Sequence, residues 1–371
     1  MTSSRMVAHV CTLALGCALA CSRPIGRADT QKAQATDKVE SEGQKILGTW
    51  QSITVKWRGQ ERKDTSFRLT FHKAGVSYAR ETYLLEGRYK LDPGAKAKAL
   101  DIDLPLETHR YLYRFEGDRL VLCEGNGTRE RPREFISPKD DRSPIITTLE
   151  RVGTKEDAHP SEAAQHKQAR MKCGGALHTL VLAMHGYIDK HGHFPPPAIT
   201  DGADTPLLSW RVAILPYLGE KELYDDFRHD EPWDSNHNKK LIPRIPKIYA
   251  SVANPPQVKH GTYYQVFAGP GALFEDGKKI SPQDVADGTV NTLAIITAVE
   301  AVPWTKPADL AYSPDMKLRP LGPGMINDGM LSFATADSSV WITRNTQDEK
   351  LMHALITRSG FEDIDMKDLR K

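Results

Sequence analysis

The sequence predicts an α+β protein made of two bodies, an antiparallel β body followed by a helical one. Between Gly48 and Val152, apolar and polar residues alternate in short runs separated by turn residues, which is typical of antiparallel strands. Residues 153–162 are polar and include Pro160, as expected of a linker. Beyond them, apolar residues recur at steps of three and four, which predicts an amphipathic helix.

The composition is that of an ordinary globular protein. Of 371 residues, 26% are charged and 39% hydrophobic, and 50 Lys and Arg nearly balance 48 Asp and Glu, for a formal net charge of +2. Because the basic residues are scattered, we expect no nucleic-acid partner. Beyond the first 21 residues only Cys123 and Cys173 remain, and no CxxC motif occurs, so we expect neither a disulfide framework nor a structural zinc site.

Residues 1–21 have the features of a targeting segment. Arg5 precedes an apolar run at residues 10–20, which has the length of a signal-peptide core and is too short for an ordinary membrane-spanning helix. The run ends in ALAC, which resembles a bacterial lipobox, and this predicts lipidation of Cys21 after cleavage. Cys17, at the end of ALGC, is the alternative site. A plain secretory signal with incidental cysteines is the competing interpretation.

Residues 22–44 are rich in Ser, Gln, Lys, Asp and Glu, and we expect them to form a flexible tether. No later window approaches the length and apolarity of a transmembrane helix. On this hypothesis the protein is exported and held in the cell envelope by its lipid, in the periplasm or at the outer membrane. Ser22 after the lipidated cysteine resembles the outer-membrane sorting signal of some bacteria.

The β body, residues 45–153, is expected to contain nine short strands. The predicted strands are 49–57, 67–72, 76–83, 85–91, 98–104, 109–116, 119–123, 131–136 and 144–152. Turn residues such as Asp92-Pro93-Gly94 separate them. Spacings near ten residues without a strong helical period indicate an antiparallel barrel or sandwich.

Several motifs of this body occur in the order found in a known domain. They are LGTWQ, EGRYKLDP, KALDIDL, YRFEGDRLVLC and RPREF. With them the body resembles a small lipocalin-like domain common in planctomycete proteins. The resemblance implies a closed or nearly closed up-and-down barrel with Trp50 plugging one end, and it implies no established activity. Since lipocalin barrels can hold one small apolar ligand, a carrier of such a ligand is one functional alternative.

The second body, residues 163–365, is expected to begin with a long helix that follows the linker at residues 154–162. The helix should end near Gly192, where three prolines follow. Its apolar stripe consists of Cys173, Leu177, Leu180, Val181, Met184 and Ile188.

Five segments of this body resemble a second family abundant in planctomycetes, the prepilin-like H-X9-DG proteins of unknown function. The segments are ARMKCGGALHTLVLAMHGYIDKHGHFPP, LSWRVAILPYLGEKELYDDF, EPWDSNHNKKLIPRIPKIY, DVADGTVNTLAIITAVEAVPWTKPADLAY and MLSFATADSSVWI. The resemblance implies a pseudopilin-like head, with one long helix packed on an antiparallel sheet. The usual N-terminal pilin helix is absent, and the signature His and DG fall on Asn327 and Asp337-Ser338. A role that depends on that histidine is therefore not expected.

The segment EPWDSNHNKKLI, residues 231–242, contains the best candidates for chemistry. Glu231 or Asp234 with His237 could supply the acid and base of an envelope hydrolase. The interpretation that the sequence favours is structural: the polar residues cap a short helix, Trp233 is buried, and the segment fixes an insertion on the head.

Two other groups invite a metal-site interpretation. His185 and Asp189, one helical turn apart, could share a metal ion, although His185 is interpreted as a packing histidine. The segment DVADGTVNT offers oxygen ligands for calcium but lacks the spacing of an EF-hand loop, so a turn is favoured. Trp304, in AVPWTKPADL, is interpreted as packing an ordered loop.

The sequence therefore predicts no catalytic residues, no cofactor and no metal site. It contains no GxSxG, HExxH, Walker A, SxxK or complete GxGxxG motif. We expect a non-catalytic exported lipoprotein that binds another envelope protein or helps organise a surface or secretion assembly. The alternatives are the apolar-ligand carrier and the hydrolase. The residues expected to have structural importance are Trp50, Trp233, Asp234, His237, Trp304 and Asp337.

Overall fold

The computed structural model describes residues 41–95, 97–126, 130–153, 161–319, 325–326, 329–344 and 348–362, together with Leu321, Met366 and Leu369. The predictions for the signal peptide with Cys17 and Cys21, for most of the tether, for residues 154–160 of the linker and for Asn327 lie outside these residues. None of the helices within them combines the length and apolarity needed to cross a bilayer.

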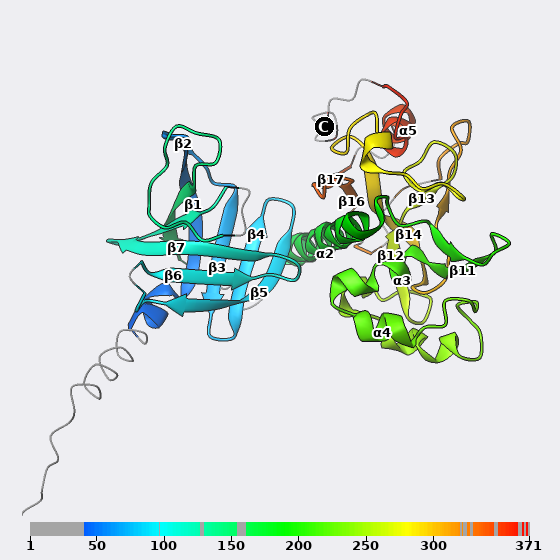
Figure 1. The fold of residues 1–371 in the computed structure, drawn as a ribbon, viewed down its shortest axis with the longest axis horizontal. Helices are drawn as coiled ribbons and strands as arrows, with labels where there is room; N and C mark the ends of the chain where they lie inside the picture. The colour runs from blue at the N-terminus through cyan, green and yellow to red at the C-terminus, as the bar shows by residue number, and fades with distance from the viewer. Residues whose placement is uncertain are drawn as a thin grey trace, which may run out of the picture.

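The protein has the predicted α+β architecture, and its N-terminal body is a closed antiparallel barrel of eight strands (Figure 1). The strands are β1 (Gly48–Trp57), β3 (Phe67–His72), β4 (Gly75–Arg80), β5 (Leu84–Asp92), β6 (Ala99–Asp103), β7 (Thr108–Glu116), β8 (Arg119–Glu124) and β9 (Ile145–Val152). Each pairs with the next, and β1 closes the ring by pairing with β9 from Thr49↔Val152 to Lys56↔Ile146.

Two details of the strand prediction are wrong. Residues 131–136 form no strand, because Pro132 cannot donate to a ladder and its neighbours are charged. Conversely, β2 (Gln60–Lys63) forms a hairpin with β1 although its residues are all exposed. Its sequence QERK has no apolar alternation from which a strand could be predicted.

Side chains with a period of two fill the inside of the barrel. The core cluster consists of Ile46, Trp50, Leu69, Phe71, Val76, Tyr78, Leu85, Leu100, Ile102, Leu104, Tyr111, Tyr113, Leu120, Leu122 and Leu149. An eight-stranded barrel is about wide enough inside to be filled by side chains. The apolar side chains of the strands therefore pack against one another inside the barrel.

Trp50 is buried at one end of this barrel. Its indole N–H donates to the carbonyl oxygen of Ile46 at 2.7 Å. The guanidinium of Arg151 lies 4.3 Å from the centre of the Trp50 rings and donates to the carbonyl oxygens of Lys45 and Leu47. Arg151, which was not singled out from the sequence, thus links strand β9 to the end of the N-terminal helical turn, residues 41–46, which covers this end of the barrel.

The C-terminal body contains the predicted long helix, α2 (Glu162–His191), packed on a four-stranded antiparallel sheet (Figure 1). Ser161 caps the start of α2, and Gly192, at φ 79°, ends it with an N–H bond to Ile188 O. The sheet has the order β12-β14-β16-β17 and consists of β12 (Gly261–Gln265), β14 (Leu293–Pro303), β16 (Leu331–Thr335) and β17 (Val340–Thr343).

Short elements surround this helix and sheet. They are β10 (Ala198–Thr200), β11 (Pro206–Ser209), α3 (Trp210–Ala213), η1 (Leu215–Leu218), α4 (Lys221–Asp226), η2 (Asn238–Lys240), η3 (Ile242–Arg244), η4 (Lys247–Tyr249), β13 (Phe267–Ala268), η5 (Pro282–Asp284), β15 (Leu310–Ala311) and α5 (Glu349–Ile356). Strands β13 and β15 pair in parallel beside the main sheet.

The turn between β16 and β17 is organised by Asp337. Its carboxylate accepts from the hydroxyl of Thr335 at 2.6 Å and from the N–H and hydroxyl of Ser339 at 3.0 and 2.8 Å. Ser338, between them, has φ 72°, in the left-handed region that favours glycine. The position therefore suits the DG dipeptide of the H-X9-DG signature better than the Asp-Ser found here.

We expect Ser338→Gly to raise the free energy of unfolding of the head by about 0.5–1 kcal/mol. The left-handed conformation costs a Cβ-bearing residue about 1–2 kcal/mol, and the greater flexibility of glycine in the unfolded chain offsets part of the gain. Urea denaturation measures the difference. Ser339→Gly is the control: it removes the hydroxyl bond to Asp337 but keeps the N–H bond, and it should destabilise the protein. Equal effects at the two positions would contradict the expectation.

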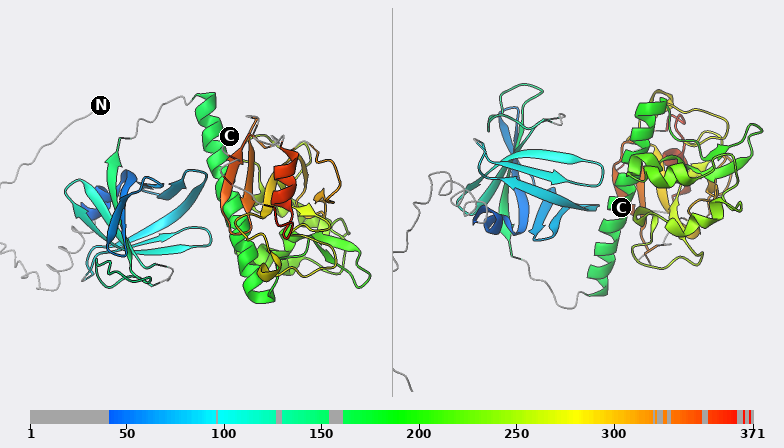
Figure 2. Two further views of the ribbon diagram at one scale, coloured as in Figure 1. Left: turned by 90° about the horizontal axis from the view of Figure 1, so that it is seen from above. Right: turned by 60° about the horizontal axis from the view of Figure 1, so that its bottom comes forward.

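Helix α2 lies between the two bodies and packs against both (Figure 2). On the barrel side, Gly174 contacts the loop between β4 and β5, and Gly175 contacts the first residue of β5. A Cβ added at Gly175 would overlap the carbonyl oxygen of Leu84, and one added at Gly174 would overlap that of Thr82. Because only glycine leaves room for this approach, the pair lets the helix backbone and the loop backbone touch.

Candidate functional site

The segment 231–242 is organised by a residue that sequence reasoning missed, Asn238. Its side chain is buried; its Oδ1 accepts from Arg228 N–H at 3.0 Å, and its Nδ2 donates to the carbonyl oxygens of Arg228, Glu231 and Pro232 at 2.9–3.1 Å. Its own N–H donates to the hydroxyl of Ser235 at 3.0 Å. One amide group thus bonds four backbone groups of the turn.

Two of the three acid–base candidates, His237 and Glu231, form local hydrogen bonds, and the third, Asp234, is exposed. His237 Nε2 bonds to the carbonyl oxygen of Asp226 at 2.8 Å, so that nitrogen donates and is not available as a base. Glu231 pairs with Arg228 at 2.7 Å, and the hydrogen bond from Arg228 lowers the pKa of Glu231 below its usual value. Asp234 is exposed, and the hydroxyl of Ser235, not Asp234, receives the backbone N–H of the following 3-10 turn.

Two tryptophans attach this segment to the head. Trp304 is fully buried, stacks on Tyr249 with ring centres 5.8 Å apart, and donates from its indole N–H to Ile242 O at 2.9 Å. Trp233 is half-buried against the core, and its backbone N–H donates to Leu207 O at 2.8 Å. These contacts make the segment 231–242 a docked insertion.

We expect Asn238→Ala to lower the free energy of unfolding by about 1–2 kcal/mol, because it leaves buried carbonyl groups without a donor. Asn236→Ala is the matched control: its side chain bonds only to the exposed Lys239, so we expect a change within about 0.5 kcal/mol. Chemical denaturation measures both. A loss at Asn238 no larger than at Asn236 would contradict the structural role.

Two histidines of α2 attach the helix to the β16–β17 turn. His178 Nδ1 lies 2.9 Å from Ser338 O, and His185 Nε2 lies 2.7 Å from Ala336 O. Since a carbonyl oxygen only accepts, each of these nitrogens carries a proton. The contact agrees with the interpretation of His185 as a packing histidine. Within the described ranges, no three His, Cys, Asp or Glu side chains are placed to hold a metal ion together.

A buried ion pair crosses the head core. Arg211 is 0% exposed and Asp309 4%, and their Nη2 and Oδ1 atoms lie 2.7 Å apart. The carboxylate of Asp309 also accepts from the indole of Trp210 at 3.1 Å and from the N–H of Val266 at 3.0 Å. Burial raises the pKa of Asp309, and Arg211 and these donors oppose that rise. The pair joins α3 to the loop before β15.

An apolar pocket of about 550 Å³ lies beside Asp309, between β14 and the segment that follows β15. Apolar side chains form most of its wall, among them Phe267, Ala298, Val299, Val302, Leu310 and Leu321. Gln265, Glu300, Asp309 and Arg319 supply its polar groups. A pocket of this size with an apolar wall and few polar groups has the features of a ligand or peptide site.

A bulge in β14 creates one wall of this pocket. The ladder passes from Thr262↔Val302 to Tyr264↔Thr297, so Tyr263 is set against residues 298–301. Such bulges re-aim side chains and are frequent near functional sites. The side chain of Gln265 fixes the bulge by donating to Glu300 O at 2.6 Å, and Val299 is 41% exposed at its crest.

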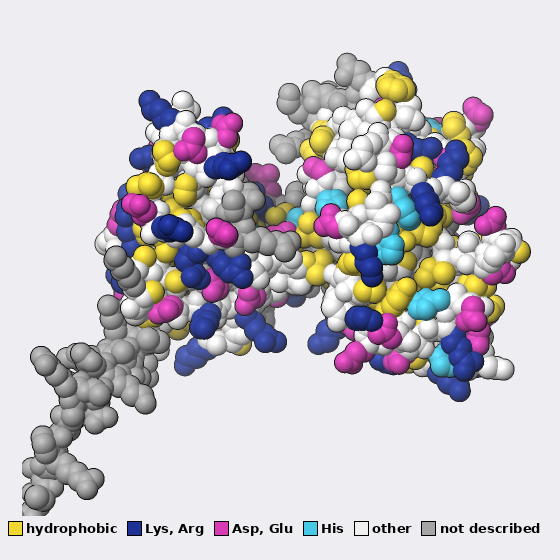
Figure 3. Space-filling model, in the orientation of Figure 1, with side chains coloured by type: hydrophobic (Ala, Val, Ile, Leu, Met, Phe, Trp, Pro, Cys, Tyr) yellow, Lys and Arg dark blue, Asp and Glu magenta, His cyan; other side chains and the backbone are white. Residues whose placement is uncertain are grey.

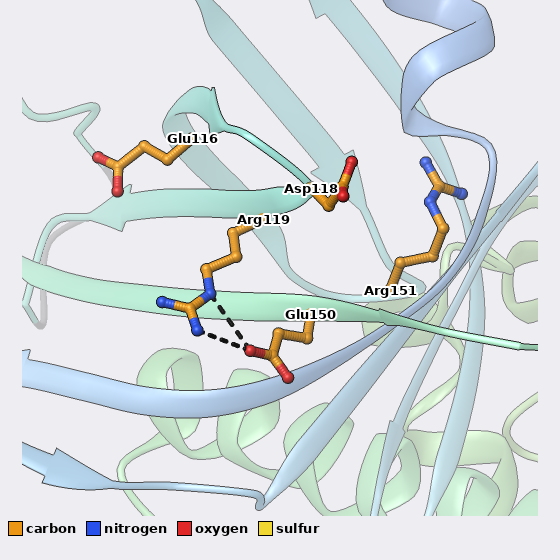
Figure 4. A pocket seen from close by; sticks show the side chains of 5 residues that line it. All are labelled: Glu116, Asp118, Arg119, Glu150 and Arg151. Carbon is orange, nitrogen blue, oxygen red and sulfur yellow. Dashed lines mark hydrogen bonds and ion pairs between the residues drawn. The ribbon is translucent and has the colours of Figure 1, made fainter.

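A second pocket, of about 450 Å³, lies at the surface of the barrel and is polar (Figure 4). Arg119 pairs with Glu150 at 2.9 Å, and Arg151 points away from this pair towards the N-terminal helical turn. Arg119, Glu150 and Arg151 thus already have bonding partners within the barrel. On the face shown in Figure 3, acidic and basic side chains are interspersed over both bodies.

Comparison with known proteins gives one match. The family described as "Protein of unknown function (DUF1559)" matches residues 164–247, from the start of α2 to η4. The chain is similar to that family over this segment. The match includes the docked insertion and covers less than half of the chain. No curated protein and no solved structure matches the chain.

Proposed function

We propose that the chain is a non-catalytic binding module of the bacterial cell envelope, exported and anchored through a lipid on Cys21. In this proposal the apolar pocket of the head binds an apolar segment of a second envelope protein. The observation that carries the proposal is the pocket itself, with its volume of about 550 Å³ and its apolar wall. The commitment of His237 and Glu231 to local hydrogen bonds favours binding over hydrolysis.

An extended peptide suits the pocket because strand edges border it. The N–H groups of Leu310 and Tyr312 donate to the carbonyl oxygens of Val266 and Ala268, so the intervening N–H of Ala311 points away from β13. Residues 298–301 of β14 are outside the ladder with β12. An added strand can bond to such edges while alternate side chains enter the pocket.

Site-specific photocrosslinking in intact cells tests the proposal. A crosslinking amino acid at Val299, on the rim of the pocket, should capture one envelope protein in stoichiometric amount. The matched control is the same amino acid at Val290, an apolar residue of the head with similar exposure, 49% against 41%, that does not line the pocket. Ala308→Phe, which fills the pocket, should abolish the Val299 crosslink. Equal capture at both positions, or none at Val299, would refute the proposal.

The anchor is tested separately by mass analysis of the mature N-terminus. We expect cleavage before Cys21 and a diacylglyceryl group on its sulfur. Cys21→Ser should move the protein from the membrane fraction to the released fraction, whereas Cys17→Ser should not. Membrane retention of Cys21→Ser would contradict the anchor without affecting the test of the pocket.

A further inference from the structure

The head presents an unpaired strand edge to the barrel. Strand β17 is the last strand of the head sheet and lies on the side of the head nearest the barrel (Figure 1). A cleft of about 420 Å³ lies beside it, lined by Val340, Trp341 and Ile342 of β17 and by residues 80–83 of the barrel. Because three successive residues of β17 line the cleft, it follows the edge of the strand and not one face of the sheet.

Alternate main-chain groups of β17 point towards this cleft. At the turn that joins β16 to β17, Thr335 N–H donates to Ser339 O at 3.0 Å. Bonded and non-bonded residue pairs alternate in an antiparallel ladder, so the next residue of β17 that bonds to β16 is Trp341. The N–H and C=O groups of Val340 and Ile342 therefore point away from β16, and no group in the described part of the chain bonds to them there.

The barrel restricts what can pair with this edge. The β4–β5 loop stands across the cleft, and the ring of its Tyr83 stacks on His178 of α2 with ring centres 4.7 Å apart. A second sheet approaching β17 edge to edge would meet this loop, which protects the edge from pairing with another copy. A single extended segment is narrower than a sheet, and the volume of the cleft is within the range of ligand sites. The edge therefore suits strand addition by one peptide.

Arg80 gives the cleft a preference for negative charge. Its Nε donates to the hydroxyl of the buried Tyr78 at 2.8 Å, which holds the side chain in place. Its two terminal nitrogens have no hydrogen-bond or ion-pair partner among the described residues, and a guanidinium with such free N–H groups matches a carboxylate. Glu81 lines the same cleft and opposes an anion, but it is exposed and can turn to solvent.

We propose that this cleft is a second peptide site, in which an extended, acidic segment of a partner protein adds a strand to β17. The main chain of the segment bonds to Val340 and Ile342, and one of its carboxylates pairs with Arg80. The site uses groups of both bodies, whereas the apolar pocket lies within the head, so the inference does not depend on what that pocket binds. A bound segment also links the barrel to the head.

Selection from a phage library of random linear dodecapeptides, on the full chain in detergent micelles, tests the proposal. We expect the selected peptides to contain Asp or Glu and to bind the full chain as fluorescein-labelled synthetic peptides. Ala308→Phe, which fills the apolar pocket, should leave their affinity unchanged. A selection that yields no binder, or only peptides whose affinity falls in Ala308→Phe, would overturn the proposal and leave the test of the apolar pocket unaffected.

The charge preference is tested with two neighbouring residues of opposite charge. Arg80→Gln should weaken the binding of the selected peptides by about tenfold, because it removes a charge-assisted pair. Glu81→Gln is the matched control, since it lines the same cleft, and it should leave the affinity unchanged or raise it. Equal weakening by the two variants would contradict an acidic ligand.

Ile342→Pro tests the strand addition. Proline has no N–H, and because the N–H of Ile342 points away from β16, the ladder of the head sheet loses no bond. We expect peptide affinity to fall by about tenfold or more, whereas Ile342→Val, which keeps the N–H and the branched side chain, should bind like the wild type. Urea denaturation identifies an unfolded Ile342→Pro, and the comparison of Arg80→Gln with Glu81→Gln then decides. Unchanged affinity in a folded Ile342→Pro, or a peptide-free dimer that this variant dissociates, would overturn the proposal.

Discussion

Arg211→Met is expected to lower the free energy of unfolding of the head by about 3–5 kcal/mol, because it leaves a buried carboxylate without its counter-charge. Asp309 is 4% exposed and cannot turn to solvent without breaking its bonds to Trp210 and Val266. Urea denaturation followed by tryptophan fluorescence measures the loss. The matched control is Arg228→Met, whose partner Glu231 is at the surface; we expect its cost to be below about 1 kcal/mol.

The double variant Arg211→Met/Asp309→Asn separates the charge from the hydrogen bonds. An amide at position 309 is neutral and keeps an acceptor for the indole of Trp210 and the N–H of Val266. We therefore expect it to restore about half of the stability lost in Arg211→Met, since only the desolvated charge is removed. If the double variant were less stable than Arg211→Met alone, the loss would come from packing and not from the unpaired charge.

The strands of the barrel could be predicted from the sequence because apolar and polar residues alternate within each of them. In β7, for example, Tyr111 and Tyr113 face the core while Arg110 and Arg114 do not. What alternation could not predict is closure, because β1 and β9 pair across about a hundred residues of chain. Arg151 was missed for the same reason, since its partners at residues 45, 47 and 50 are distant in sequence.

The strands of the head sheet show weaker apolar–polar alternation in the sequence. In β12 and β16 all five residues are buried, so both faces are covered and no period of two appears. That sheet was anticipated only through the family resemblance, whereas α2 was predicted from its apolar stripe and its terminal glycine. The part of the chain that matches a known family contains α2 and the docked insertion but not this sheet.

The residues that organise the candidate sites could not be predicted from the sequence. In the segment 231–242, for which the sequence favours a structural role, Asn238 rather than Asp234 bonds the backbone of the turn. The pocket is formed by residues from β12 to Leu321, and Glu107 of the barrel lies 3.4 Å from His178 Nε2 of the head. No local pattern marks such partners, because the fold brings them together through contacts that are specified elsewhere in the chain.

Gly175→Ala is expected to separate the two bodies while leaving each of them folded. The new methyl group would overlap the carbonyl oxygen of Leu84 and approach the side chain of Leu85. Relief requires backbone movement, for which we expect a cost of about 3 kcal/mol in docking. The same change favours the helix itself by about 1 kcal/mol. Docking should therefore weaken while α2 itself becomes more stable.

Single-molecule energy transfer between fluorophores attached through unnatural amino acids at the exposed Lys56 of the barrel and Lys247 of the head measures the docked population of Gly175→Ala. Gly186→Ala is the matched control on the same helix, because its methyl group would meet only the ring of Tyr217, at 3.0 Å, which belongs to the head and can move. We expect an open distribution for Gly175→Ala and a wild-type distribution for Gly186→Ala. If Gly175→Ala remained docked, close backbone contact would not be what holds the barrel on α2, and side-chain contacts such as the stacking of Tyr83 on His178 would have to supply the docking free energy.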